Sequence, residues 1–151
     1  MKKSTIILFC LLVSTTSLLA NPKHEFRATW FTTHYGIDWP KTEATSDSKR
    51  KQQKQEMTAI FDKMKAGNMN VVCMQVRSLC DAMYKSSYEN WSSLLTGTRG
   101  KDPGYDPLAF AIEEAHKRGL ELHVWVNPFR VTSSGTVSTS DKVWQNAGQW
   151  I

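Results

Sequence analysis

The sequence lacks the local signatures of several common protein classes. Its 151 residues contain no glycine-rich phosphate loop and no G-x-S-x-G nucleophile elbow, and its four histidines show none of the spacings of zinc ligands. Cysteine is scarce, with three residues in all. Phosphate-loop, serine-hydrolase and metal-dependent chemistry therefore receive no support, and we predict neither a cofactor nor a metal site.

Length and composition then bound what is present. The chain has 40% apolar, 11% aromatic and 22% charged residues, which is typical of a globular protein with a packed core. A chain of 151 residues suits one domain, but a complete (β/α)8 barrel needs about 250 residues.

The N-terminal segment has the organisation of a secretory signal peptide. Basic residues in Met1–Lys3 precede the apolar run Ile6–Val13, which gives way to small residues ending at Ala20. Polar residues 14–17 interrupt this run well before the ~20 residues that a membrane-spanning helix needs. We therefore predict a signal peptide over residues 1–20, and over residues 21–151 an exported protein, periplasmic or extracellular, without a stable membrane anchor.

Removal of this segment changes the charge and the cysteine content. The net charge falls from +5 to +3, with 17 basic against 14 acidic residues, and a nucleic-acid partner is not indicated. Cys73 and Cys80 remain. The strand that contains Cys73 carries the chain about 13 Å onward to Arg77, so we predict two unpaired, partly buried cysteines rather than a disulfide.

Strand and helix patterns alternate along the chain. Apolar and β-branched runs predict strands, and apolar residues at intervals of three and four predict helices. The predicted strands cover residues 26–32, 70–76 and 120–126, and the predicted helices cover residues 49–66 and 107–118. This order predicts an α/β fold with a parallel sheet.

The second helix has the clearest boundaries. Asp106 is a suitable N-cap, Pro107 fits the first helical position, and Gly119 can end the helix. Two ion pairs four residues apart are expected on its exposed side, Glu113 with Lys117 and Glu114 with Arg118. The expected buried stripe consists of Leu108, Ala111, Ile112 and Ala115.

Two long connections follow the first and second strands. They cover residues 33–48 and 77–105, and loops of this length in compact domains commonly carry function. In parallel α/β folds, ligands bind where these connections begin, at the carboxyl ends of the strands. Candidate substrate-binding residues here are Tyr35, Asp38, Trp39 and Asp81. The alternative is that the aromatic rings pack the loops and the carboxylates make structural hydrogen bonds.

The second and third strands each carry polar residues on one face. This face includes Gln75 and Arg77 in one strand and Trp125 and Asn127 in the other, with Arg130 just beyond. Either the face meets solvent, or it lines a barrel interior that opens onto a polar cleft. Amides and guanidinium groups at strand ends supply directed donors for hydroxyls or carboxylates, although an arginine can instead serve in a structural ion pair. A histidine on this face, His123, is expected to be a hydrogen-bonded core residue.

Six segments in this order resemble the family 10 glycosyl-hydrolase-like proteins of bacteria, over about residues 25–135. The matching segments are RATW at 27–30, YGIDWP at 35–40, QVR at 75–77, DAMY at 81–84, LTGTRGKDPGYDPL at 95–108 and WVNPFR at 125–130. The resemblance implies a (β/α)8 barrel in an exported protein that hydrolyses a polysaccharide, with peptidoglycan glycan as one substrate class. The family's acidic D-D-Y type segment after the fourth strand has no counterpart.

The spacing of the predicted strands implies that this chain holds about three of eight barrel units. We therefore expect an N-terminal fragment of a longer barrel, the alternative being a half-barrel that dimerises. Two carboxyl groups must flank a scissile glycosidic bond, and no catalytic residue can be assigned here. We expect Gln75, Arg77, Trp125, Asn127 and Arg130 to position substrate. The alternatives are a non-catalytic carbohydrate-binding or cell-wall-associated module, and an inactive remnant.

Overall fold

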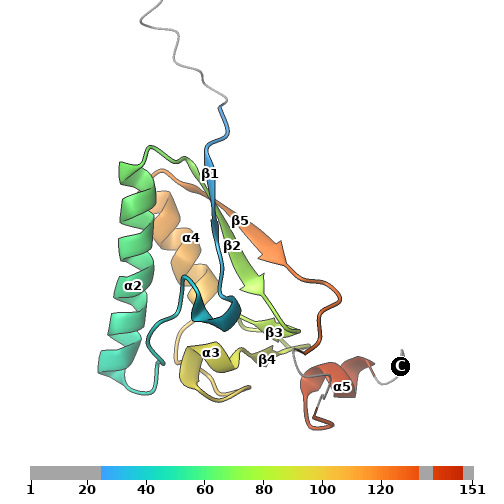
Figure 1. Ribbon diagram of the computed structural model, residues 1–151. Helices are drawn as coiled ribbons and strands as arrows, with labels where there is room; N and C mark the ends of the chain where they lie inside the picture. Colours follow the sequence, from blue (N-terminus) through green and yellow to red (C-terminus); the bar gives the residue numbers. More distant parts are fainter. Residues whose placement is uncertain (1–24, 133–137, 148–151) are drawn as a thin grey trace, which may run out of the picture.

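The computed structural model describes residues 25–132 and 138–147 (Figure 1). The predicted signal peptide lies outside these residues. The strands are β1 (Ala28–Phe31), β2 (Val71–Arg77), β3 (Asp81–Ala82), β4 (Asn90–Trp91) and β5 (Glu121–Val126). The helices are η1 (His34–Gly36, a 3-10 turn), α2 (Asp47–Ala66), α3 (Ser93–Thr96), α4 (Pro107–Lys117) and α5 (Lys142–Ala147).

A three-stranded parallel sheet forms the centre of the fold, in the order β1-β2-β5. In its register, Trp30, Cys73 and His123 lie side by side across the sheet. Strands β3 and β4 form a separate parallel pair. The predicted parallel α/β layout is therefore confirmed for the described part of the chain, while a closed barrel is not part of it.

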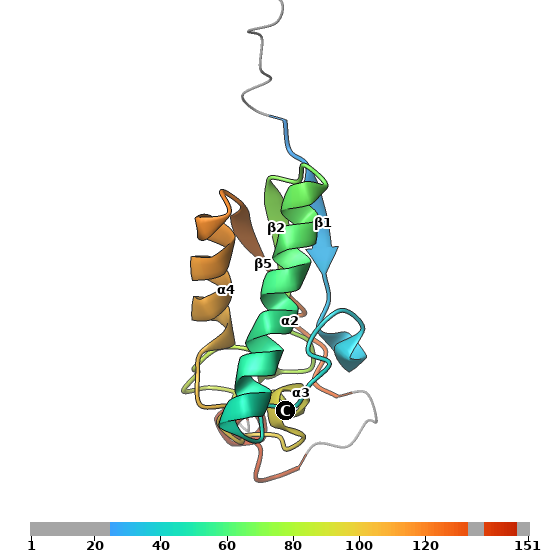
Figure 2. The same ribbon diagram turned by 90° about the vertical axis from the view of Figure 1, so that its left-hand side faces the viewer.

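Helices α2 and α4 lie together on one side of this sheet (Figure 2). The core between the helices and the sheet includes Phe31, Phe61, Met74, Ala111 and Leu120, each with at most 1% of its surface exposed. Burial of such side chains contributes about 1.5–3 kcal/mol each for the larger ones. The layer therefore holds β1, β2 and β5 at fixed positions relative to one another.

The other face of the sheet carries no helix among the described residues (Figures 1 and 2). Trp30 is 64% exposed there, and the half-exposed His123 contacts the ring of Phe26 at a centroid distance of 5.7 Å. The expectation that His123 is a core residue is therefore wrong, because nothing in the described chain covers its strand on this side.

The boundaries of the two long helices follow their capping residues. The side chain of Ser46 accepts a hydrogen bond from Lys49 N, so α2 begins two residues before the predicted start. Asp106 caps α4 as expected, by accepting from Ala109 N at 3.0 Å. Both predicted ion pairs on α4 are present.

One residue of the predicted buried stripe on α4 is exposed in the structure. Ile112 is 39% exposed, whereas Ala111 and Ala115 are fully buried. Phe110 faces α2, where its ring lies beside Lys54. Ile112 is two residues further along the helix, which corresponds to a rotation of about 200° around the helix axis. Ile112 therefore points away from α2, toward a side where the described chain places no further helix.

The long connections contain short elements that the sequence pattern did not predict, namely η1, β3, β4 and α3. The buried Gln53 of α2 connects α3 and two points of the long connections, Thr42 and Tyr105, to the helix layer. Its amide donates to Thr42 O at 2.6 Å and Leu95 O at 3.0 Å, and accepts from the Tyr105 hydroxyl at 2.6 Å. No described helix is long and apolar enough to span a membrane.

Candidate functional site

The carboxyl ends of β1, β2 and β5 meet at one edge of the sheet, and η1, β3, β4 and α3 gather beside it (Figure 1). In parallel α/β folds this is the edge where ligands bind. A β-bulge at this end of β2 pairs Arg77, rather than Val76, with Val126 of β5. We refer to His34, Gln75, Arg77, Ser78, Glu89, Trp125 and Asn127 as the strand-end cluster.

Gln75 organises the turn that follows β1. Its side chain is buried, and its carbonyl oxygen accepts hydrogen bonds from Thr33 N at 3.0 Å, His34 N at 2.9 Å and the Thr32 hydroxyl at 2.9 Å. These bonds satisfy backbone donors that β1 leaves open where it ends. The predicted site residue Gln75 thus fixes η1, and its side chain is closed to ligand in this structure.

Arg77 forms a half-buried ion pair with Glu89, with 2.5 Å between Nε and the carboxylate. Its other nitrogens donate to the carbonyl oxygen of Asn127 and to the sulfur of Cys80. Burial opposes the charge of Arg77, but the hydrogen bond and charge of Glu89 outweigh it and raise the pKa of the guanidinium above its ordinary value. Arg77 therefore makes the structural ion pair that was the alternative interpretation, and its contact with substrate stays a prediction.

The sequence prediction did not include Glu89. The available signal was an acidic residue twelve positions after Arg77, inside the same long connection. The neighbouring Cys80 is buried and Cys73 is partly buried, and both are free thiols, so the prediction of unpaired cysteines is confirmed. Burial raises the pKa of the Cys80 thiol, and the thiol therefore stays protonated at neutral pH.

Trp125 and Asn127 form a hydrogen-bonded pair at the end of β5. The indole N–H of Trp125 donates to Asn127 Oδ1 at 2.9 Å, and Asn127 Nδ2 donates to the carbonyl oxygen of Ser78 at 3.2 Å. The rings of Trp30 and Trp125 are nearly perpendicular, with 4.9 Å between their centroids. Two indoles and an oriented amide therefore lie on the helix-free face.

His34 extends this network to η1. Its Nδ1 lies 2.8 Å from the Ser78 hydroxyl, while Nε2 has no partner among residues 25–132 and 138–147. The ring of Tyr35 lies 4.1 Å from that of His34, and Tyr35 is 70% exposed. Tyr35 has φ of +53°, a strained value for a bulky side chain. His34 is not among the candidate site residues predicted from the sequence, although it lies just beyond the first predicted strand.

Of the remaining predicted site residues, Asp81 contacts the strand-end cluster through a hydrogen bond from Ser78 N at 3.3 Å, and the others lie outside the cluster. Asp38 accepts from Thr32 N at 2.8 Å, and Asp81 accepts from Leu79 N at 2.8 Å, so both carboxylates shape turns. Trp39 is fully buried, and its indole N–H donates to Gln53 O at 2.9 Å. Arg130 is exposed, beyond the end of β5.

The arrangement can bind and orient a ligand more readily than it can cleave one. Its accessible groups are aromatic rings and His34 Nε2, whereas the nearby carboxylates of Asp38, Asp81 and Glu89 are all engaged. Glycoside hydrolysis requires two carboxyl groups flanking the scissile bond. Within the described residues, no group of three or more His, Cys, Asp or Glu side chains could hold a metal ion.

Comparison with known proteins agrees with these observations. Residues 25–149 match the family model described as glycosyl hydrolase-like 10. The chain is 48% identical over 117 residues to "Glycosyl hydrolase YngK" of Bacillus subtilis (strain 168), covering 78% of this chain and 22% of that protein. It is 38% identical over 118 residues to "Glycosyl hydrolase DigH" of Escherichia coli (strain K12), covering 74% of this chain and 27% of that protein.

The chain thus spans about a quarter of the length of these curated relatives. The family match covers most of its residues, including every strand of the central sheet. The chain belongs to the glycosyl hydrolase-like 10 family.

Proposed function

We propose that this chain forms the first three or so units of a (β/α)8 barrel in an exported glycoside hydrolase that cleaves a polysaccharide. Peptidoglycan glycan is the substrate class we would test first. The family and the names of the relatives support a carbohydrate-directed hydrolase. Strands that are parallel, with both long helices on one side, are the arrangement found in one sector of such a barrel.

The strand-end cluster is the observation that carries this proposal. Hydrogen bonds connect Trp125, Asn127, Ser78 and His34 across all three strand ends. The network leaves two kinds of group facing outward, the aromatic rings and His34 Nε2. An aromatic ring offers an apolar face for the C–H groups of a sugar, and an imidazole nitrogen can bond a hydroxyl.

The described carboxylates do not supply the acid and nucleophile of this reaction. Asp38 and Asp81 hold backbone amides, and Glu89 is paired with Arg77. Asp38 and Asp81 each bond through one oxygen only, but a catalytic role would compete with the turn or ion pair that each of these carboxylates holds. We therefore place both catalytic carboxylates outside this chain, on later strands of the proposed barrel.

The same engagement of the carboxylates favours a second candidate function, a carbohydrate-binding module without catalysis. Both candidates use the strand-end cluster to bind glycan. They differ in whether the longer gene product carries paired carboxyl groups at later strand ends.

The test uses the product of the complete reading frame and peptidoglycan glycan strands freed of their peptides. The number of new reducing ends measures hydrolysis, and co-sedimentation with the insoluble glycan measures binding. We expect ends to be released, and Trp125→Ala to lower the rate at least tenfold because the sugar loses its platform. Trp144→Ala is the matched control, since Trp144 lies on α5 and is not part of the cluster.

The outcomes separate the candidates. Binding without new reducing ends supports the module and rejects the hydrolase. If the glycan is neither bound nor cleaved, both candidates fail.

Export has its own test, because the predicted signal peptide lies outside the described residues. Expression of the complete reading frame in a bacterium, followed by mass spectrometry of the N-terminal peptide, should show a chain that begins at Asn21. A chain that retains Met1 and stays in the cytoplasm would reject the exported location.

A further inference from the structure

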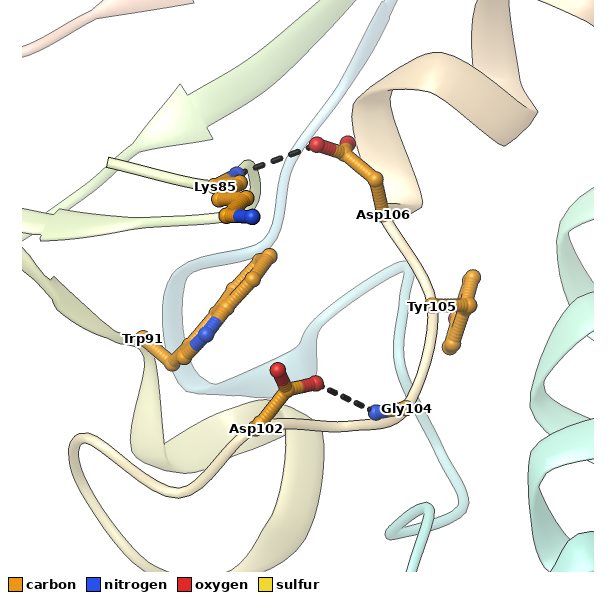
Figure 3. Close-up of a pocket in the computed structure, with 6 residues that line it drawn as sticks. All are labelled: Lys85, Trp91, Asp102, Gly104, Tyr105 and Asp106. Atoms are coloured by element: carbon orange, nitrogen blue, oxygen red, sulfur yellow. Dashed lines mark hydrogen bonds between the residues drawn. The ribbon is translucent and has the colours of Figure 1, made fainter. Parts of the chain in front are cut away.

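A pocket lies outside the strand-end cluster. It has a volume of about 400 Å³ and is bounded by the segment after β3, by β4 and by the segment that enters α4 (Figure 3). Pockets that bind small ligands have volumes of about 300–1,000 Å³. Its chemistry depends on Lys85, Trp91, Asp102 and Asp106, and Gly104 and Tyr105 complete the lining.

Trp91 supplies an aromatic wall with a free donor. The half-buried ring lies between Lys85 and Asp102 in Figure 3. Its indole N–H donates to no acceptor among the described residues. Every buried side-chain nitrogen or oxygen in this part of the chain has a hydrogen-bond partner, so a nitrogen without a partner is not buried. The N–H therefore reaches solvent, in contrast with those of Trp39 and Trp125, which are hydrogen-bonded inside the protein.

Two further polar groups of the pocket have hydrogen-bonding capacity that no described residue uses. The ammonium group of Lys85 has no carboxylate or carbonyl partner among the described residues, since only its backbone N–H is bonded. Asp102 uses Oδ1 to accept from Gly104 N at 2.6 Å, which leaves Oδ2 open. The pocket thus presents two donors and one acceptor around an aromatic ring.

Asp106 limits the charge of the ligand. Its oxygens accept from Ala109 N and Lys85 N, each at 3.0 Å, so the start of α4 is already capped by a carboxylate. The lining contains one ammonium and two carboxylates, and an anion such as phosphate is therefore disfavoured. A neutral ligand with an apolar face and several hydroxyls fits these groups.

We propose that this pocket is a second saccharide-binding site, which takes a neutral pyranose residue stacked on Trp91, with its hydroxyls bonded to Asp102, Lys85 and the indole N–H. The ligand class is that of the proposed function, and the site is separate from the strand-end cluster. A glycan held at both places would lie across the loops at the carboxyl edge of the sheet.

The test is a nuclear magnetic resonance titration of the ¹⁵N-labelled full chain with fully N-acetylated chitotetraose, a neutral oligosaccharide. Indole N–H signals are assigned by Trp→Phe variants. We expect a saturable shift of the Trp91 signal. Asp102→Asn keeps the bond from Gly104 N but loses the charged acceptor, and it should weaken binding about tenfold. Lys101→Ala, a change of an exposed neighbour that does not line the pocket, should leave the affinity unchanged.

Each outcome decides one question. If the Trp125 signal shifts and the Trp91 signal does not, this pocket is rejected and the strand-end site is retained. A shift of Trp91 alone supports the pocket and counts against glycan binding at the strand ends. Trigalacturonate, an anionic probe, should bind more weakly than chitotetraose, and tighter binding of it would reject a neutral ligand.

Discussion

At the scale of single residues, the strain at Tyr35 separates a binding role from a structural one. A positive φ is costly for a residue with a Cβ atom, by about 1–2 kcal/mol, and costs glycine little. Tyr35→Gly should therefore leave the free energy of unfolding unchanged or raise it, while saccharide affinity falls at least fivefold. Thermal unfolding and the same glycan titration provide the two measurements.

Tyr35→Phe is the matched control, because it keeps both the ring and the strain. If Tyr35→Gly unfolds the protein more easily than Tyr35→Phe does, the ring stabilises the fold and the binding role is contradicted.

The ion pair between Arg77 and Glu89 should matter far more than an exposed pair. Glu89→Gln leaves a half-buried guanidinium without its counter-charge, and we expect it to cost about 2 kcal/mol of stability. Glu25→Gln removes a similar contact to Arg27, but Glu25 is 55% exposed, and the expected cost is below about 0.5 kcal/mol. Urea unfolding measures both. Equal costs would show that Arg77 is as well solvated as Arg27.

At the scale of elements, the carboxylate at the start of α4 joins two parts of the fold. Asp106 caps the helix and also accepts from Lys85 N, in the segment after β3. Asp106→Ala should therefore lower the free energy of unfolding by about 1–2 kcal/mol. Ser46→Ala at the start of α2 breaks one longer bond of 3.3 Å and should cost less. A larger loss for Ser46→Ala would contradict this ranking.

The last turn of α4 predicts a dependence of stability on pH. Hydrogen bonds from Lys117 and Arg118, both 2.7 Å, hold the pKa of Glu114 below its ordinary value. A carboxyl whose pKa is lowered by folding stabilises the protein above its unfolded pKa of about 4.3, and this contribution is lost as the pH falls through the folded value.

Glu114→Gln should therefore cost about 0.5 kcal/mol at pH 7, and the difference from wild type should shrink as the pH falls below about 4. Urea unfolding from pH 3 to pH 7 measures this difference. A difference that does not change with pH would show that the charge of Glu114 contributes nothing.

The elements that the sequence predicts are those with local signals. Periodic apolar residues and the cap at Asp106 act within one or two turns of a helix, so α2 and α4 could be located closely, although the cap at Ser46 was not predicted. The short elements η1, β3, β4 and α3 have no such periodicity. They depend on bonds over long sequence distances, such as those from Gln53 to Leu95 and from Thr33 to Gln75.

The sequence predicted where the candidate site lies better than it predicted which side chains contact one another there. Alternation along two strands located Gln75, Arg77, Trp125 and Asn127 at the carboxyl edge. The partners Glu89 and Ser78 could not be found, because a loop of this length has no pattern that fixes which of its residues turn inward. For the same reason the sequence could not choose between the two roles left open for Trp39, and the structure shows the alternative in which its ring packs the loop.

At the scale of the whole molecule, β5 is the feature that bears most directly on the proposed barrel. It pairs with β2 on one side, and no described strand pairs with its other side. On the helix side of the sheet, Val124 is 55% exposed and Val126 46% exposed, and Ile112 of α4 is exposed as well. In a barrel, a further strand and helix would cover this edge and these side chains.

Hydrogen exchange can test whether the edge is paired in the longer gene product. The backbone N–H groups of Glu121 and Asn127 point toward β2, where they donate to Asn70 O and Arg77 O. Successive N–H groups along a parallel strand point to opposite sides. The N–H of Trp125 therefore points to β2, and that of Val124 points to the open edge. In this chain, the Val124 amide should exchange at least a hundredfold faster than the Trp125 amide. In the product of the complete reading frame, we expect both to be protected, because a fourth parallel strand would accept the Val124 N–H. Fast exchange of Val124 in both proteins would leave β5 as a true sheet edge and would contradict the barrel.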